Sequence, residues 1–405
     1  MGGGLIQLVA RGAQDVYLTG NPQITYFKTV YRKHTNFSID TIEQPLSSFN
    51  YGAQTSAIIS RTGDLIHRMY LHLTFDPLTS VGSWGGWTNG LGNAIIDTVE
   101  LEIGGQVIDK QSGEWMDIWN ELSIGANKNI YDQLVGNYKS EYSLRTNGVN
   151  KKTYHIPLNF WCCRNAGNSL PLIALQYHEV KINFKFKEKN KLIIGSTAYP
   201  NGGNLSCASL YTEYIYLDTD ERRRFAQNSH EYLIEQIQLN EFPITSGTKQ
   251  KTVDLKIYHP VKELIWVFSK TSNATEGYNA NKWLTYSASE TAAITDGISK
   301  YEAFNKCKII FNGIDRLTEK TASYFRTIQA YQHHSGNVRK HIYMYSFALK
   351  PEEHQPSGTC NFSLINQTSL NFTFESADSS MLKLYAHNYN ILRITNGLGG
   401  VAYKN

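Results

Sequence analysis

VELEIGGQVID, residues 99–109, has a near copy later in the chain, CKIIFNGIDRL, at residues 307–317. In each stretch, three alternating apolar residues precede a two-residue turn, Gly104-Gly105 in the first and Asn312-Gly313 in the second. Both dipeptides tolerate positive φ and are typical of two-residue β-hairpins. The two stretches therefore predict one hairpin used twice, 208 residues apart.

Two later pairs of stretches match at a smaller separation. HIPLNF (155–160) resembles IYMYSF (342–347), and KINFKF (181–186) resembles SLNFTF (369–374), at separations of 187 and 188 residues. A longer polar connection in the first copy, residues 123–153, explains the difference, because a change in the length of a surface loop costs little free energy. We infer one all-β unit used twice, with a junction near LDTDERRRF (217–225). Chance similarity between β patterns is the alternative.

Period-2 alternation supports antiparallel strands with one face on a core. It recurs in residues 68–75, 180–187 and 252–257. Helices are expected to be few and short. One is predicted by the spacing of Trp115, Ile118, Trp119 and Leu122, and another over residues 217–225, where Asp218 can cap the helix and Glu221 stands in a capping-box position.

The composition of the chain limits the classes of protein to which it can belong. The 405 residues are 41% hydrophobic and 18% charged, which suits two or three folded domains, and the net charge of +4 is too small to indicate a nucleic-acid binder. No apolar window of 18 residues predicts a membrane span, and no signal peptide is recognised. The five cysteines are odd in number and scattered, so we expect reduced, mostly buried thiols.

Adjacent polar pairs are the first candidates for chemistry, and none has the spacing that catalysis or metal binding needs. No second histidine follows His230-Glu231 at the zinc-protease spacing, so a strand pair is expected. His333-His334 and Cys162-Cys163 are neighbours that would face opposite sides of a strand. Glu352-Glu353 lies in a proline-flanked turn, where nothing positions an acid/base pair.

Glycine-rich and basic stretches are the other candidates. SVGSWGGWTNGLGN (80–93) lacks a phosphate-loop pattern and is expected to be a flexible exposed loop, with Trp84 and Trp87 as weak candidates for contact with a sugar or partner. The glycines at 397–400 leave no room for a nucleotide-binding unit. Residues 222–224 are all arginine, but nearby acids favour helix capping and ion pairs. No catalytic, cofactor-binding or metal-binding residue is predicted, and no cofactor.

Five long blocks resemble the major capsid proteins of nucleocytoplasmic large DNA viruses, the group that includes the algal chloroviruses. They are GGLIQLVARGAQDVYLTGNPQITYFK (3–28), RTGDLIHRMYLHLTF (61–75), YIYLDTDERRRFAQNSHEYLIEQIQ (214–238), LKPEEHQPSGTCNFSLINQTSL (349–370) and YAHNYNILRITNGLGGVAY (385–403). The blocks span both ends of the chain in the family's order. Residues 76–93 and 271–300 match nothing in particular.

The resemblance implies an all-β fold of two tandem eight-stranded antiparallel jelly-rolls with a few short helices. We expect an N-terminal arm over 1–25, a first jelly-roll over 26–216, a connecting helix over 217–228 and a second jelly-roll over 229–405. The arm lacks strong alternation, and Asn21-Pro22 separates it from the first strand.

The resemblance also implies a non-enzymatic shell protein of the virion, assembled in the host cytoplasm. It would form pseudo-hexagonal homotrimers that contact neighbouring capsomers and minor capsid and penton proteins, with the arm on the inner face near the internal membrane, and would not touch nucleic acid directly. Two other functions stay open on the sequence. A carbohydrate-binding or carbohydrate-cleaving β-sandwich is suggested by the aromatic content, and a minor capsid or vertex protein by the same family resemblance.

Overall fold

The computed structural model describes residues 2–79, 85–139, 141–195, 201–274, 281–286, 302–375 and 377–404. It divides into two units, Met1–Asn36 and Phe37–Asn405. The first unit contains two short helices that the sequence did not signal, α1 (Gly3–Val9) and α2 (Ala13–Thr19), and none of its described residues is buried. The domain boundaries expected at residues 25, 216 and 228 stay predictions.

The first half of the larger unit is a jelly-roll of two antiparallel sheets, ordered β1-β13-β3-β8 and β2-β10-β6-β7. Numbered along the chain, these eight main strands lie in the order 1-8-3-6 and 2-7-4-5. Their bounds are β1 Phe37–Pro45, β2 Gln54–Ile58, β3 Leu65–Phe75, β6 Ile96–Ile103, β7 Gln106–Gln111, β8 Lys152–Pro157, β10 Val180–Phe186 and β13 Leu205–Leu217.

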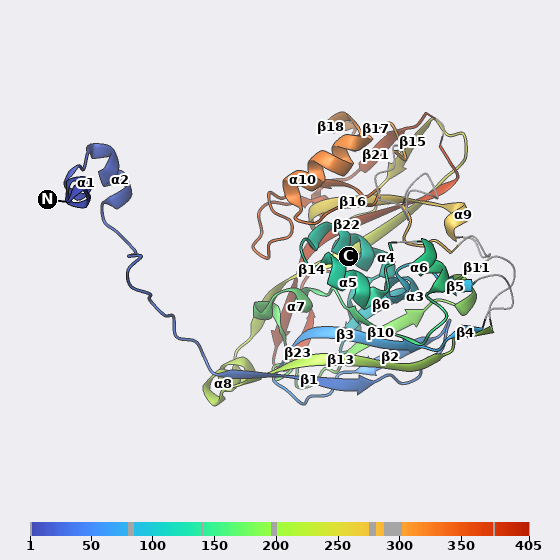
Figure 1. Ribbon diagram of the computed structural model, residues 1–405, viewed down its shortest axis with the longest axis horizontal. Coiled ribbons are helices and arrows are strands. Elements are labelled where there is room, and N and C mark those ends of the chain that lie inside the picture. The colour runs from blue at the N-terminus through green and yellow to red at the C-terminus, as the bar shows by residue number, and fades with distance from the viewer. Residues whose placement is uncertain are drawn as a thin grey trace. The chain divides into compact units, whose positions relative to one another are not determined.

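The second half repeats the same order in sheets β14-β22-β16-β19 and β15-β21-β17-β18. Its main strands are β14 His230–Ile244, β15 Gln250–Asp254, β16 Pro260–Lys270, β17 Lys306–Phe311, β18 Ile314–Thr321, β19 Tyr343–Ser346, β21 Thr368–Thr373 and β22 Ser380–Thr395. The fold is a double jelly-roll, as expected. In Figure 1 the first jelly-roll runs from blue to lime green and the second from yellow to red.

Strand register confirms the internal repeat. Phe184 of β10 lies opposite Val99 of β6, and Phe372 of β21 lies opposite Cys307 of β17. The two pairs are equivalent, because Phe372 follows Phe184 by 188 residues and Cys307 follows Val99 by 208 residues, the two separations found in the sequence. The change of separation falls between β7 and β8 in the first copy and between β18 and β19 in the second. The connection over 112–151 is longer than the one over 322–342, and its described residues form the three helices α4, α5 and α6.

Shorter elements complete both halves. In the first they are β4 Leu78–Thr79, β5 Gly85–Trp87, α3 Leu91–Ile95, α4 Gly113–Ser123, α5 Lys128–Val135, α6 Glu141–Thr146, α7 Trp161–Arg164, η1 Ala166–Asn168, β9 Leu170–Pro171, η2 Lys189–Leu192, β11 Ile193–Gly195 and β12 Asn201–Gly202. Helix α8, Thr219–Gln227, joins the halves. In the second they are α9 Thr271–Ala274, η4 Tyr324–Ile328, α10 Gln329–His333, β20 Cys360–Asn361, η5 Phe362–Leu364 and β23 Leu398–Val401. No helix among the described residues is long and apolar enough to cross a membrane.

Each jelly-roll encloses its own apolar core, built from the alternation read in the sequence. In β10 the inward residues Val180, Ile182, Phe184 and Phe186 are buried, while the intervening lysines and asparagine are not. The predicted strand over 252–257 is shorter than expected, because β15 ends at Asp254, although Leu255 and Ile257 are still buried.

The junction helix was predicted correctly. Helix α8 begins after Asp218, whose side chain accepts a hydrogen bond from the backbone N–H of Thr219 at 2.8 Å. Arg222 pairs with Asp64 of the first jelly-roll at 3.0 Å, so this basic residue forms an ion pair, as expected of the arginine run.

Candidate functional site: the interface between the two jelly-rolls

Helix α4 of the first jelly-roll builds an apolar core against the second. Ser112 caps it by accepting a hydrogen bond from the N–H of Trp115 at 3.2 Å, and every residue from Gly113 to Leu122 is buried. The four residues whose spacing predicted this helix pack on one sheet of the second jelly-roll. The joint core contains Trp115, Ile118, Trp119, Leu122, Ile265, Val267, Tyr286, Ala330, Ile342, Met344 and Tyr385.

Strand β16 is therefore buried on both faces, which explains its nearly continuous apolar sequence. Leu264 and Trp266 face the interior of the second jelly-roll, while Ile265 and Val267 face α4. Figure 1 shows α4 and α5 between the two sets of strands.

Acidic residues of α4 pair with lysines of the second jelly-roll at the edge of this core. The carboxylate of Glu114 lies 2.5 Å from Lys383 Nζ, and that of Asp117 lies 2.5 Å from Lys340 Nζ. Burial raises the pKa of Asp117, and Lys340 opposes the rise. Lys383 also lies 3.8 Å from Glu241 of its own jelly-roll, but its shorter contact is with Glu114 across the interface.

Just as α4 packs on the second jelly-roll, residues of the second jelly-roll pack into the first. Ile234 of β14 and Leu392 and Ile394 of β22 extend from the second jelly-roll into the core of the first. In addition, the buried amide of Asn281 donates hydrogen bonds to the carbonyls of Asn190 and Ile193, at 2.8 and 2.9 Å. The two jelly-rolls are thus interlocked, as their assignment to one compact unit indicates.

A buried network of charged side chains lies beside α4. It joins Arg164 of α7 in the first jelly-roll to strands β14, β16 and β22 of the second. Arg164 forms an ion pair with Glu235, which also accepts from Lys262 Nζ at 2.6 Å. We call Arg164, Glu235, Lys262, Glu263, His334, Glu352 and His387 the interface charge cluster.

Two histidines link the carboxylates of the interface charge cluster. His387 lies 2.9 Å from Glu263 through Nδ1 and 2.9 Å from Glu235 through Nε2. His334 lies 2.9 Å from both Glu263 and Glu352. The side chains of His334, His387 and Glu263 have no exposed surface. Such burial requires that every charge be paired.

The pKa values follow from this pairing. Burial alone would lower the pKa of His334, but Glu263 and Glu352 outweigh it and raise the pKa to about 9. Burial would raise the pKa of Glu263, but His334 and His387 hold it well below its usual range. Burial and the nearby Lys262 lower the pKa of His387.

The directions of these shifts agree with the pairing. The raised pKa of His334 keeps this residue charged at neutral pH, between the carboxylates of Glu263 and Glu352. Glu235 is likewise flanked by two basic side chains, Arg164 and Lys262.

The indole of Trp119 joins the apolar core to the charge cluster. The guanidinium carbon of Arg164 lies 4.3 Å from its ring centroid and Lys262 Nζ lies 5.7 Å away. The ring of His387 meets the indole edge-on at 4.9 Å. Cation–π contact in this largely buried site adds to the ion pairs.

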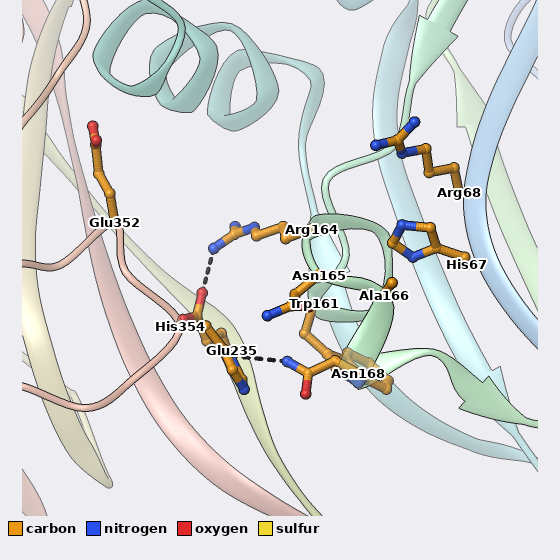
Figure 2. A pocket seen from close by; sticks show the side chains of 10 residues that line it. All are labelled: His67, Arg68, Trp161, Arg164, Asn165, Ala166, Asn168, Glu235, Glu352 and His354. Carbon is orange, nitrogen blue, oxygen red and sulfur yellow. Dashed lines mark hydrogen bonds and ion pairs between the residues drawn. The ribbon is translucent and has the colours of Figure 1, made fainter. Parts of the chain in front are cut away.

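A pocket of about 360 Å³ adjoins the cluster, between α7 and the second jelly-roll (Figure 2). Two contacts cross it, the Arg164–Glu235 ion pair and a 2.9 Å hydrogen bond from Asn168 to His354. Its lining residues are His67, Arg68, Trp161, Arg164, Asn165, Ala166, Asn168, Glu235, Glu352 and His354. Because both lining carboxylates are already paired, the arrangement suits holding two jelly-rolls in place better than transferring protons to a substrate.

The adjacent polar pairs singled out in the sequence are separated by the fold. His230 and Glu231 begin β14, as expected, and Glu231 pairs with Arg393 at 2.8 Å. His333 and His334 lie at the end of a helix and not on a strand: α10 ends at His333, and only His334 enters the charge cluster.

Cys162 and Cys163 also lie on a helix, α7, and not on a strand, with their sulfur atoms 4.0 Å apart. All five cysteines are free thiols, but only Cys162 and Cys307 are buried and the other three are partly exposed.

The two glutamates of the proline-flanked turn have different partners. Glu352 contacts His334, and Glu353 pairs with the exposed Lys350 at 2.7 Å.

The expected exposed loop at residues 80–93 is wrong for its second part. Trp87 is fully buried in the first core, and residues 91–95 form the buried helix α3. Trp84 lies outside the described residues. The turn at 396–397 joins β22 to β23, with positive φ at both residues.

Sequence reasoning missed most of the charge cluster. A signal was present at Lys262-Glu263, two charged residues inside the otherwise apolar run 261–268. A charged pair within a strand buried on both faces must find partners.

Comparisons with known proteins agree with the fold. A model described as major capsid protein N-terminus matches residues 25–218, and one described as large eukaryotic DNA virus major capsid protein matches 221–400. The major capsid proteins of Pyramimonas orientalis virus and Paramecium bursaria Chlorella virus 1 are 44% and 40% identical, over 100% of both chains in each case.

Solved structures show the same likeness. The crystal structure of PBCV-1 VP54 superimposes with a TM-score of 0.79 at 33% identity, covering 94% of this chain and 100% of that one. The Faustovirus major capsid protein, 11% identical, shares the fold with a TM-score of 0.75 over 95% of this chain and 94% of its own. The two tandem jelly-rolls, the two matched models and the full-length relatives show that this chain belongs to the major capsid proteins of large eukaryotic DNA viruses, a family of structural proteins of the virion and not of enzymes.

Proposed function

We propose that this chain forms a homotrimeric capsomer of pseudo-hexagonal outline, the repeating block of an icosahedral shell. Three copies of a chain with two like jelly-rolls place six barrels around a threefold axis, and a closed ring of this kind tiles a surface with few gaps. The observation that carries the proposal is the repeated strand order, β1-β13-β3-β8 and then β14-β22-β16-β19.

The interface between the jelly-rolls supports the same proposal. A six-sided block keeps its shape only if the two barrels within each chain hold a constant angle. The joint core around α4 and the interface charge cluster provide that rigidity, because any rotation of one barrel would expose apolar side chains and separate buried ion pairs.

The proposed partners are neighbouring capsomers and minor capsid and penton proteins, with assembly in the host cytoplasm. We propose that the arm lies on the inner face and contacts minor proteins or the internal membrane. Its exposed apolar side chains support this, because they need a partner in the assembled particle. They are Leu5, Ile6, Leu8, Val9, Val16, Tyr17, Leu18 and Ile24. We propose no direct contact with nucleic acid, which the net charge of +4 supports.

Light scattering on the purified chain tests the trimer. We expect a mass three times 45.9 kDa from low to high salt. A stable monomer at every salt concentration would contradict the proposal. The number of copies per purified particle separates a shell protein, which dominates the particle, from a vertex protein, which is scarce.

A further inference from the structure

The helical segment η4–α10 of the second jelly-roll is the counterpart of α4 in the first. Met116 of α4 packs into the first core, and Phe325 of η4, 209 residues later, packs into the second. The four residues with which α4 packs on the second jelly-roll have counterparts at the same separation, which are Tyr324, Thr327, Ile328 and Tyr331.

These counterparts are largely uncovered. Ile328 and Tyr331 are 46% and 89% exposed, whereas their equivalents on α4, Trp119 and Leu122, are buried. We call the exposed residues Thr327, Ile328 and Tyr331 the helix face. An exposed apolar group at the position of a buried one indicates a surface that another protein covers.

The sheet on which α4 packs also has a counterpart, in the first jelly-roll. Leu71 of β3 and Trp266 of β16 hold equivalent positions, because each pairs with core residues of both neighbouring strands. On the opposite face of the second sheet, three apolar residues are buried against α4, namely Ile265, Met344 and Tyr385. Their equivalents in the first jelly-roll are partly exposed and are here called the sheet face, Tyr70, Pro157 and Tyr211.

The chain therefore carries both halves of a second contact of the same kind, one half on each jelly-roll. A closed threefold ring of six like barrels repeats the contact between neighbouring barrels, alternately within a chain and between chains. We propose that the helix face of one copy packs on the sheet face of the next copy, as α4 packs on the second jelly-roll within the chain. This inference rests on the proposed trimer and assigns the surfaces that hold it together.

The strands at the edge of the contact have complementary charges. Within the chain, Gln236 of β14 donates a hydrogen bond to the carbonyl of Ile108 on β7. Asp40 of β1 is the equivalent of Gln236 by strand register, and Arg316 of β18 follows Ile108 by 208 residues, the separation of the two hairpins. Both Asp40 and Arg316 are exposed, so the repeated contact would bring opposite charges together between two copies.

The side chains of the two faces suit an interface between proteins. Three of them are tyrosines, Tyr70, Tyr211 and Tyr331, a residue type enriched at the centre of such interfaces. The ring of Tyr211 already meets that of His72 edge-on at 5.3 Å, so little of its freedom remains to be lost on binding.

Ile328→Glu tests the helix face. A carboxylate forced into an apolar contact should raise the protein concentration at which half of the chains are trimeric by about tenfold or more, measured by light scattering over a dilution series. Ile58→Glu is the matched control. Ile58 is 54% exposed on β2, at the opposite edge of its sheet from β7, and its replacement should leave the trimer unchanged. Circular dichroism establishes that both variants are folded.

A photoreactive benzoylphenylalanine in place of Tyr331 identifies the surface that the helix face contacts, and it replaces one aromatic side chain by another. Irradiation of the full-length trimer should join two copies, with the cross-link on β3, β8 or β13. The assigned contact is overturned, with the trimer intact, if the cross-links lie on other segments or if folded Ile328→Glu is as trimeric as the wild type. A monomeric wild type overturns the proposed trimer and this contact together.

Discussion

Glu263 is the most deeply buried of the three carboxylates in the interface charge cluster. Its side chain has no exposed surface and lies 2.9 Å from both His334 and His387. We predict that Glu263→Gln lowers the free energy of unfolding by about 3 kcal/mol, because it removes one of the two carboxylates that balance the buried charge of His334. Urea denaturation followed by tryptophan fluorescence measures the loss.

Glu353→Gln is the control for this prediction. Glu353 pairs with Lys350, but both side chains are more than half exposed, so we expect a change below about 0.5 kcal/mol. Equal losses in the two variants would show that burial of the cluster contributes nothing.

His334 predicts a pH dependence on the alkaline side. Its pKa rises from 6.5 to about 9 on folding, so the folded state holds this proton more tightly than the unfolded state. The stabilisation is complete below pH 6.5 and is lost as the pH rises through 9, by about 3 kcal/mol in total. Urea midpoints of wild type and His334→Gln should therefore converge over this window.

The adjacent His333 provides a matched control, since His333→Gln should keep the wild-type pH dependence. A wild-type midpoint that does not change between pH 6.5 and 9 would contradict the assignment of a charged His334.

At the level of elements, the two repeated hairpins should behave alike. Gly105 and Gly313 have φ of 81° and 82°, and a Cβ added at either would meet no atom within 4 Å. We predict that Gly105→Ala and Gly313→Ala each lower the free energy of unfolding by about 1–2 kcal/mol, because only backbone strain opposes the new methyl group.

Gly167→Ala is the comparison for the hairpins, because Gly167 has no positive φ and its Cβ would make one ordinary contact of 3.5 Å. It should cause no loss of stability. A clear difference between Gly105→Ala and Gly313→Ala would contradict the equivalence of the two turns.

Most of these elements could be read from the chain, because local pattern determines them. The hairpins, strand β10, the spacing of α4 and the cap of α8 all rest on residues close together in sequence. The misreadings have the opposite cause. Residues 85–93 look like a loop by their glycines, yet the core of the first jelly-roll buries Trp87 there. His334 pairs in sequence only with its neighbour His333, yet its partners Glu263 and Glu352 come from other segments.

In the whole molecule, the interface core couples the two jelly-rolls. Ile118 is fully buried in that core and belongs to neither barrel interior. We predict that Ile118→Ala costs about 2–5 kcal/mol, as is usual for a large-to-small change in a core. In scanning calorimetry we expect one transition for the wild type and two for Ile118→Ala, because the barrels lose their coupling.

Ile130→Ala on α5 serves as its control, because Ile130 is 60% exposed and its removal leaves no cavity. A lowered but still single transition in Ile118→Ala would show that the strands shared between the barrels are sufficient to couple them.

The amino-acid order alone specifies two like β units, their hairpins and the short helix between them, because alternation, turn dipeptides and caps act over a few residues. Only the folded chain decides how the units join. The partners of Glu235, Glu263 and His387 come from segments far apart in sequence, and their pKa values depend on burial that no local pattern records.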